Sequence, residues 1–112
     1  MQHDVEKYLI DILAAAYDIQ QFVGAMSFDE YHANKLVKAA VERKFEVSGE
    51  ALNRLARLSQ PSIAAIREYE KIISFRNVVI HGYDVVSDPI VWDVIQQKLP
   101  LLIEDVERLS SA

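Results

Sequence analysis

Apolar residues recur at three- and four-residue spacing along most of the chain, which is the period of an amphipathic α-helix. The spacing predicts a first helix over residues 3–23, which Gly24 ends as a C′ residue. It predicts a second helical region over about 28–58, where Ser27 as N-cap and Glu30 at N3 fit a capping box. Both segments can therefore bury one face and expose the other.

Two features disturb the regularity of the second helical region. We expect a break near Ala33-Asn34. Gly49 lies in mid-helix, where glycine costs about 1 kcal/mol relative to alanine. A neighbouring helix that approaches the backbone closely would explain a glycine at this position.

The second half of the chain contains two further helices. Ser59-Gln60-Pro61-Ser62 indicates a break, after which the spacing predicts a third helix from about Ile63 to His81, with Gly82 as its stop. Ser87-Asp88-Pro89 predicts a new start with Pro89 at N1, and Pro100 should kink or interrupt the last helix. Short connections between four or five helices predict an all-α, antiparallel up-and-down bundle, in one domain over residues 1–112.

The composition fits a soluble globular protein, with 51% hydrophobic and 26% charged residues. No apolar run reaches the roughly 20 residues that a membrane span needs, and the acidic N-terminus does not resemble a signal peptide, so we expect a cytoplasmic protein. The chain has no cysteine. His3 and His32 have no ligand partners at a suitable spacing, so we expect neither a metal site nor a cofactor.

The net charge of −5 argues against a large nucleic-acid-binding surface, but the charges are unevenly distributed. The segment 35–76 has nine Lys and Arg residues against five acids and leads into Arg76, whereas both flanking segments are acidic. Solvated helix faces explain these cations as well as contacts with nucleic acid would. In the same way, Glu50 and Arg54 fit an i,i+4 surface pair, and Trp92 fits the core or a dimer interface.

Polar groups gather at the end of the third predicted helix. At about 100° per residue, Arg76 and Tyr83 lie within about 20° of each other if the helix continues that far, and Asn77 and His81 share a neighbouring stripe. The helix C-terminus favours a protonated His81, and a guanidinium suits a phosphate.

This set suffices to cleave RNA without a metal. The ribose 2′-hydroxyl attacks its own phosphodiester while His81 moves protons and Arg76 stabilises the developing charge. One copy supplies only one histidine and one arginine. The chemistry therefore predicts a homodimer, in which two copies supply one such pair for each end of the displacement. The spacing Arg-x4-His alone arises by chance in roughly one such chain in six, and a surface arginine with a histidine that caps helix carbonyls is the alternative.

The chain resembles the HepT family of HEPN-domain toxins over nearly its whole length. The resemblance includes residues 11–13, Met26-Ser27-Phe28, FEVSGEAL at 45–52, Val91-Trp92 and Leu99-Pro100. The family's central motif is Arg, a polar residue, three more positions, His, one residue and Tyr. The segment FRNVVIHGY at 75–83 matches it without departure.

The resemblance implies a toxin that is a metal-independent endoribonuclease, with a composite site in a helical homodimer. It makes Arg76 and His81 catalytic, gives Asn77 a supporting role and makes Tyr83 the residue that a minimal nucleotidyltransferase antitoxin modifies with AMP. The RNA substrate, whether tRNA or mRNA, stays open. The alternatives are a non-catalytic helical partner or substrate-binding subunit of a nucleotidyltransferase, and a plain dimerisation module.

Overall fold

The computed structural model describes residues 3–81 and 87–111, with residues 76–81 described by their backbone alone. All the regular secondary structure in these ranges is helical. The elements in chain order are α1 (His3–Val23), α2 (Phe28–Ala33), α3 (Lys35–Leu58), α4 (Gln60–Ala64), α5 (Tyr69–His81), α6 (Asp88–Asp93), the π-helical turn η1 (Val94–Lys98) and α7 (Leu99–Ser111).

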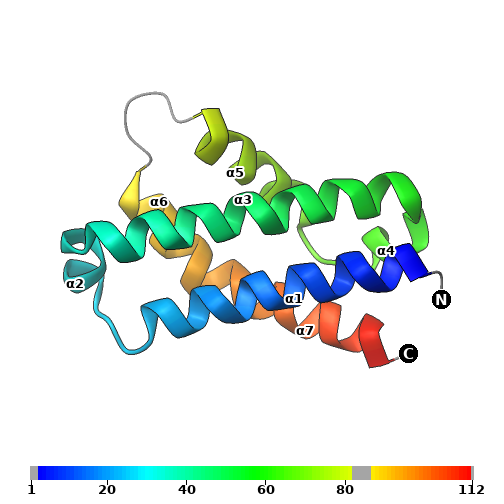
Figure 1. The fold of residues 1–112 in the computed structure, drawn as a ribbon, viewed down its shortest axis with the longest axis horizontal. Helices are drawn as coiled ribbons and strands as arrows, with labels where there is room; N and C mark the ends of the chain where they lie inside the picture. Colours follow the sequence, from blue (N-terminus) through cyan, green and yellow to red (C-terminus); the bar gives the residue numbers. More distant parts are fainter. Residues whose placement is uncertain (1–2, 82–86, 112) are drawn as a thin grey trace.

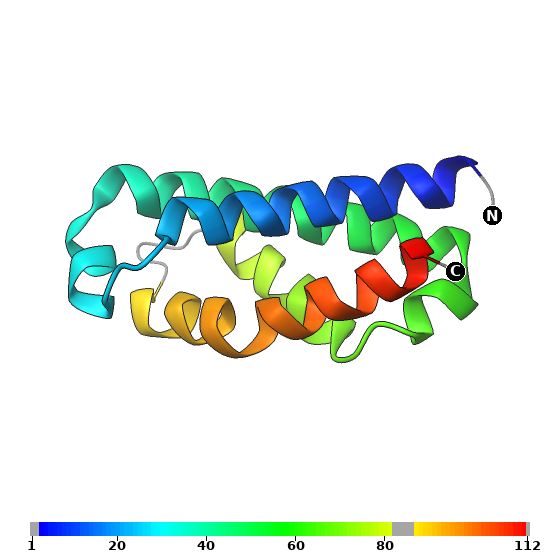
Figure 2. The same cartoon turned by 90° about the horizontal axis from the view of Figure 1, so that it is seen from below.

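The long helices form an antiparallel bundle, as the sequence predicts. Figure 1 shows α1 and α3 side by side and running in opposite directions, with α5 against α3 and the segment from α6 to α7 crossing behind α1. Figure 2 shows α1 and α3 as one layer and the segment from α6 to α7 as a second. The start of α1 and the end of α7 lie close together, at the opposite end of the bundle from α2.

Apolar residues from every α-helix form one core between these layers. In α1 the buried positions follow the four- and three-residue steps that the sequence predicts. Tyr31 from α2 and Ile63 from α4 close the core at its two ends. The core residues with the least exposure include Leu9, Ile12, Ile19, Tyr31, Val41, Phe45, Leu52, Leu55, Ile63, Ile66, Leu99 and Leu102. Within the described ranges, no helix is long and apolar enough to cross a membrane.

The local signals at helix ends are confirmed. Gly24 follows α1 at φ +52°, in the left-handed region that glycine adopts without a steric penalty. The hydroxyl of Ser27 accepts a hydrogen bond from the backbone N–H of Glu30, and the carboxylate of Glu30 accepts one from the N–H of Ser27. Asn34 ends α2 and caps α3, where its side chain accepts from the N–H of Val37 at 3.0 Å. The break near Ala33-Asn34 is therefore confirmed.

The prediction of one helix from about Ile63 to His81 is wrong. The chain turns over residues 65–68 between α4 and α5, and Glu68 adopts φ +57°. Also, α4 begins three residues earlier than predicted, at Gln60, because Ser59 acts as its N-cap and Pro61 fits the first turn. Two separate short helices thus replace the long one.

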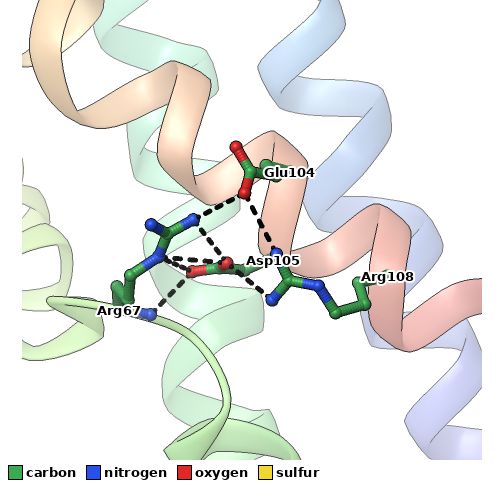
Figure 3. A network of polar contacts seen from close by, with 4 residues as sticks. All are labelled: Arg67, Glu104, Asp105 and Arg108. Atoms are coloured by element: carbon green, nitrogen blue, oxygen red, sulfur yellow. Dashed lines mark hydrogen bonds and ion pairs between the residues drawn. The ribbon is translucent and has the colours of Figure 1, made fainter.

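Ion pairs with distant residues hold this turn (Figure 3). Asp105 of α7, of which 1% is exposed, accepts hydrogen bonds from the backbone N–H of Arg67 at 2.8 Å and from its Nη2 at 2.9 Å. Glu104 accepts hydrogen bonds from the guanidinium groups of Arg67 and Arg108, and Arg108 also donates to Asp105. We call these four residues the Asp105 clamp.

Glu68 makes a second tie, to η1. Its carboxylate accepts hydrogen bonds from Lys71 at 2.7 Å and from Lys98 at 2.9 Å. These two ammonium groups, Lys71 first, lower the pKa of Glu68 to about 2. Since Lys98 belongs to η1, this carboxylate joins the start of α5 to the last helical segment.

Pro100 interrupts the last helix as predicted, and the interruption is a π-helical turn. A proline at 100 cannot donate to the carbonyl of Gln96, and its ring crowds that carbonyl. The chain widens over Val94–Lys98, where the N–H of Leu99 bonds to the carbonyl of Val94, five residues back. Such turns are often found at functional sites.

Candidate active site

Helix α5 carries three of the four candidate residues in its last two turns. Phe75, immediately before Arg76, is 8% exposed and packs edge-on against Phe45 of α3, with ring centroids 5.0 Å apart and planes at 86°. Ile72, one turn earlier, is also buried. The helix that presents the motif is therefore anchored to α3 by the apolar residues directly before it.

The helical backbone continues from Arg76 through His81. At about 100° per residue, the positions of Asn77 and His81 differ by about 40° around the helix, whereas those of Arg76 and His81 differ by about 140°. Asn77 and His81 thus share a stripe, and Arg76 lies on a different side of the same helix. The side chains of these three residues, and the whole of Gly82 and Tyr83, lie outside the described residues.

The chain is anchored again where it re-enters the described part of the structure. Asp88 is the first residue of α6 and is 8% exposed. Its carboxylate accepts a hydrogen bond from Nζ of Lys38 at 3.0 Å and contacts Nδ1 of His32 at 2.7 Å. This Asp88 anchor joins α6 to α2 and α3, so the segment that contains Tyr83 is bounded by Phe75 on one side and by Asp88 on the other.

Opposing effects act on the carboxylate of Asp88. Burial is the largest effect and raises its pKa, but hydrogen bonds and charge from Lys38 and His32 together outweigh it, so the pKa is below its ordinary value. Asp88 is therefore an anion that contacts one lysine and one histidine.

Two more titratable groups lie beside the Asp88 anchor. Burial, and then the charge of Asp88, raise the pKa of Glu42, which is one turn after Lys38 on α3. Tyr31 is fully buried, and its hydroxyl has no hydrogen-bond partner in the described part of the chain. Burial raises the pKa of this phenol, as do the charges of Glu42 and Asp88. A Tyr31 hydroxyl in this environment stays protonated and is a donor.

Most cations of the basic segment are engaged in ion pairs with neighbouring carboxylates. The pairs are Lys38–Asp88, Arg43–Glu46, Lys44–Asp18, Arg54–Glu50, Arg67–Asp105 and Lys71–Glu68. The i,i+4 pair between Glu50 and Arg54 is confirmed, at 3.0 Å. These contacts favour the interpretation that the segment forms solvated helix faces, at least for the residues before Arg76.

No sequence pattern indicates the Asp88 anchor. His32 has no metal-ligand partner by spacing, and the described residues contain no group of three or more ligands that could hold a metal ion. Its contact with Asp88 spans 56 residues of chain, which no local pattern reveals. Trp92 is partly buried and packs against the core, with its ring centroid 5.4 Å from that of Tyr31.

Comparison with known proteins identifies the family. The family model described as "Ribonuclease HepT-like" matches residues 12–109. Among curated relatives, "Putative RNase MJ0127" of Methanocaldococcus jannaschii is 32% identical over 95% of this chain and 87% of its own. "Putative RNase MJ1380" of the same organism is 28% identical over 95% and 96% of the two chains.

A third relative, "Probable ribonuclease HepT" of Thermococcus cleftensis, is 28% identical over 97% of this chain and 98% of its own. No solved structure matches the chain significantly. The family match covers the whole of α5, including Phe75, and the Asp88 anchor. From its sequence and its helical bundle, this chain belongs to the HepT-like ribonuclease family.

Proposed function

We propose that this protein is a metal-independent endoribonuclease of the toxin type, with Arg76 and His81 as its catalytic residues and Asn77 supporting them. The observation that carries the proposal is the continuous helix α5, which holds the Arg-x4-His motif in its last two turns. Family membership and the names of the relatives, which describe ribonucleases, support the same activity.

The reaction needs no group beyond the RNA and two proton carriers. The ribose 2′-oxygen forms a bond to phosphorus and the bond from phosphorus to the 5′-oxygen breaks, leaving a 2′,3′-cyclic phosphate. One His81 takes the proton of the 2′-hydroxyl and a second His81 donates a proton to the leaving 5′-oxygen. Arg76 stabilises the charge on the phosphoryl oxygens.

The geometry of α5 supports a site shared between two copies. Because the positions of Arg76 and His81 differ by about 140° around one helix, a single α5 does not present both on one face. Two copies of α5 across a two-fold axis bring the arginine of each near the histidine of the other, and they supply the two histidines that the reaction uses. We therefore propose a homodimer as the active form.

Modification of Tyr83 would control this site. We propose that a minimal nucleotidyltransferase antitoxin transfers AMP from ATP to the Tyr83 hydroxyl. The added phosphate would compete with RNA for Arg76, and the nucleotide would block the site sterically.

The test is cleavage of mixed-sequence RNA by purified variants. Losing a proton-transfer group costs about 10²–10⁴ in rate, so His81→Ala and Arg76→Ala should each lose cleavage while keeping the helical fold. The matched controls are His3→Ala and Arg57→Ala, which remove exposed residues of the same types from α1 and α3 and should leave the rate unchanged. Products should carry cyclic phosphate ends, and EDTA should have no effect.

The same experiment tests the non-catalytic alternative, a helical partner subunit of a nucleotidyltransferase. The ion-paired cations of α3 favour that alternative, because they leave little free positive charge for RNA on the described surface. Unmodified wild-type protein that cuts no RNA, yet accepts AMP on Tyr83 when the nucleotidyltransferase is added, would establish it and refute the ribonuclease.

A further inference from the structure

The end of the bundle formed by α2, α6 and η1 contains a pocket that the proposed chemistry does not use. Its volume is about 380 Å³, and its walls are Phe28, Pro89, Trp92, Asp93, Gln96 and Gln97. We call it the Trp92 pocket. It opens to solvent beside the Asp88 anchor, on the side of the molecule to which the chain returns after Tyr83.

Two aromatic rings form the apolar wall. The rings of Phe28 and Trp92 meet at 72° with centroids 6.0 Å apart. Each ring also packs against another side chain. Phe28 stacks on His32 with centroids 5.6 Å apart, and Trp92 contacts the buried ring of Tyr31. Both rings are half-buried, so each is fixed by packing and still presents a surface to the pocket.

The polar wall comes from the end of α6 and from the π-helical turn. Asp93, Gln96 and Gln97 are exposed, and within the described part of the chain no hydrogen bond engages their side chains. Each amide offers a donor pair and an acceptor, and the carboxylate offers acceptors alone. The π-helical turn that precedes Pro100 supplies both amides.

The charge of the wall selects the kind of ligand. None of the six lining residues is a cation, and one is a carboxylate, so a phosphate would be repelled. A flat, uncharged heterocycle with hydrogen-bonding edges suits both walls, which is how proteins hold unpaired RNA bases. A carboxylate accepts from an exocyclic amino group, and uracil has none.

The pocket is within reach of the proposed cleavage site. Tyr83 and Pro89 are six positions apart in the chain, and a segment of that length spans at most about 22 Å. A single strand that enters the site near Tyr83 therefore needs few nucleotides to reach the Trp92 pocket.

We propose that the Trp92 pocket is a nucleobase subsite that receives an unpaired, amino-bearing base of the substrate RNA. The proposal rests on RNA as the substrate of this protein. Phe28 and Trp92 stack on the base, Asp93 accepts from its amino group, and Gln96 and Gln97 bind its remaining edge. The subsite would then favour cleavage near guanine, cytosine or adenine over cleavage in uracil runs.

The tryptophan itself reports on occupancy, because Trp92 is the only one in the chain. Wild-type protein is titrated with GMP, CMP, AMP, UMP and ribose 5-phosphate, and its fluorescence is corrected for collisional quenching with free N-acetyltryptophanamide. We expect saturable quenching by the amino-bearing nucleotides, weaker binding of UMP by about fivefold or more, and no quenching by ribose 5-phosphate. Single nucleotides cannot be cleaved, so this result does not depend on the ribonuclease activity.

Variants of exposed residues test the polar wall without disturbing the core. Asp93→Asn exchanges an acceptor for an amide and should bring CMP and UMP to similar affinity. Gln96→Ala combined with Gln97→Ala should weaken all bases, whereas Gln21→Ala, an exposed glutamine of α1, should change nothing. Absence of saturable quenching by every nucleotide, or unchanged base preference in Asp93→Asn, would overturn the proposal.

A further experiment distinguishes two possible occupants of the Trp92 pocket, a base of the substrate RNA and the adenine of an AMP attached to Tyr83. Protein carrying AMP on Tyr83 should keep unquenched Trp92 fluorescence if the pocket serves RNA. Quenching in the modified protein that excludes added CMP would assign the pocket to the modification and refute its role as an RNA subsite.

Discussion

The Asp105 clamp makes a prediction that connects stability to the candidate site. Asp105→Ala removes the acceptor for the backbone N–H and the guanidinium of Arg67, and so releases the turn from which α5 starts. The carboxylate is buried, while the side chains of Arg67 and Arg108 are 49% and 62% exposed. After the substitution both guanidinium groups regain water, so no buried cation is left without a partner.

The magnitude follows from what the substitution removes. Breaking a fully buried ion pair costs about 3–5 kcal/mol, and the exposure of the two arginines reduces that cost. The loss of hydrogen bonds to a charged acceptor is worth about 1.5–3 kcal/mol. We therefore expect Asp105→Ala to lower the free energy of unfolding by about 2–3 kcal/mol, which is roughly 10 °C in Tm for a domain of this size.

Acid should remove the same contribution from the wild-type protein. Burial is the largest effect on Asp105 and raises its pKa, but hydrogen bonds from the side chain and backbone of Arg67, with the charges of Arg67 and Arg108, bring the pKa below its ordinary value. A carboxylate with a lowered folded-state pKa stabilises fully above its unfolded pKa of about 3.9 and loses that effect as the pH falls through the folded-state value. The gap in Tm between wild type and Asp105→Asn should therefore be constant above about pH 4 and narrow below it.

Thermal unfolding followed by circular dichroism, at one protein concentration, measures both effects. The control is Glu104→Ala, because Glu104 contacts the same two arginines from an exposed position and should cost less than about 1 kcal/mol. Ribonuclease activity of Asp105→Ala, assayed well below its Tm, should also fall, since the turn that leads into α5 loses its tie to α7. Equal losses from Glu104→Ala and Asp105→Ala would refute the argument from burial.

Three further outcomes are expected. Light scattering at micromolar concentration should give twice the 12.8 kDa of one chain, and a monomer would remove the composite site. Incubation with the cognate nucleotidyltransferase, ATP and Mg²⁺ should add AMP to Tyr83 and stop RNA cleavage, whereas Tyr83→Phe should escape; peptide mass mapping that finds AMP on another tyrosine would contradict this. Ser27→Ala should lower the free energy of unfolding by about 1 kcal/mol through loss of the capping box, and an unchanged Tm would show that the capping box does not contribute to stability.

The sequence predicts those parts of the fold that local chemistry determines. The bounds of α1, the capping box at Ser27 and the interruption at Asn34 all depend on residues within four positions of one another. The π-helical turn before Pro100 follows from the missing N–H of a proline, although the sequence alone indicates only an interruption and not its form.

The turn over residues 65–68 could not be predicted in this way. It contains neither glycine nor proline, and Ile66, Tyr69 and Ile72 keep helical spacing across it. Its partners are Asp105 and Lys98, which lie 38 and 30 residues away along the chain. A single sequence shows the charges of these residues but not that the bundle brings them to one place.

The sequence predicts the motif at the end of α5, but it does not predict the contacts that hold α5 in place. The polar residues at the end of the helix follow one another in the chain, so their clustering requires only that the helix persist through His81. Their setting depends on contacts between distant elements. The Asp105 clamp holds the turn that precedes α5, Phe75 packs on Phe45 before the motif, and the Asp88 anchor returns the chain to α2 and α3 after it. The Asp88 anchor also fixes the start of α6, whose next residue, Pro89, lines the Trp92 pocket. Substituting Asp88 would therefore disturb the pocket as well, because His32, which contacts Asp88, stacks on Phe28 in the pocket wall.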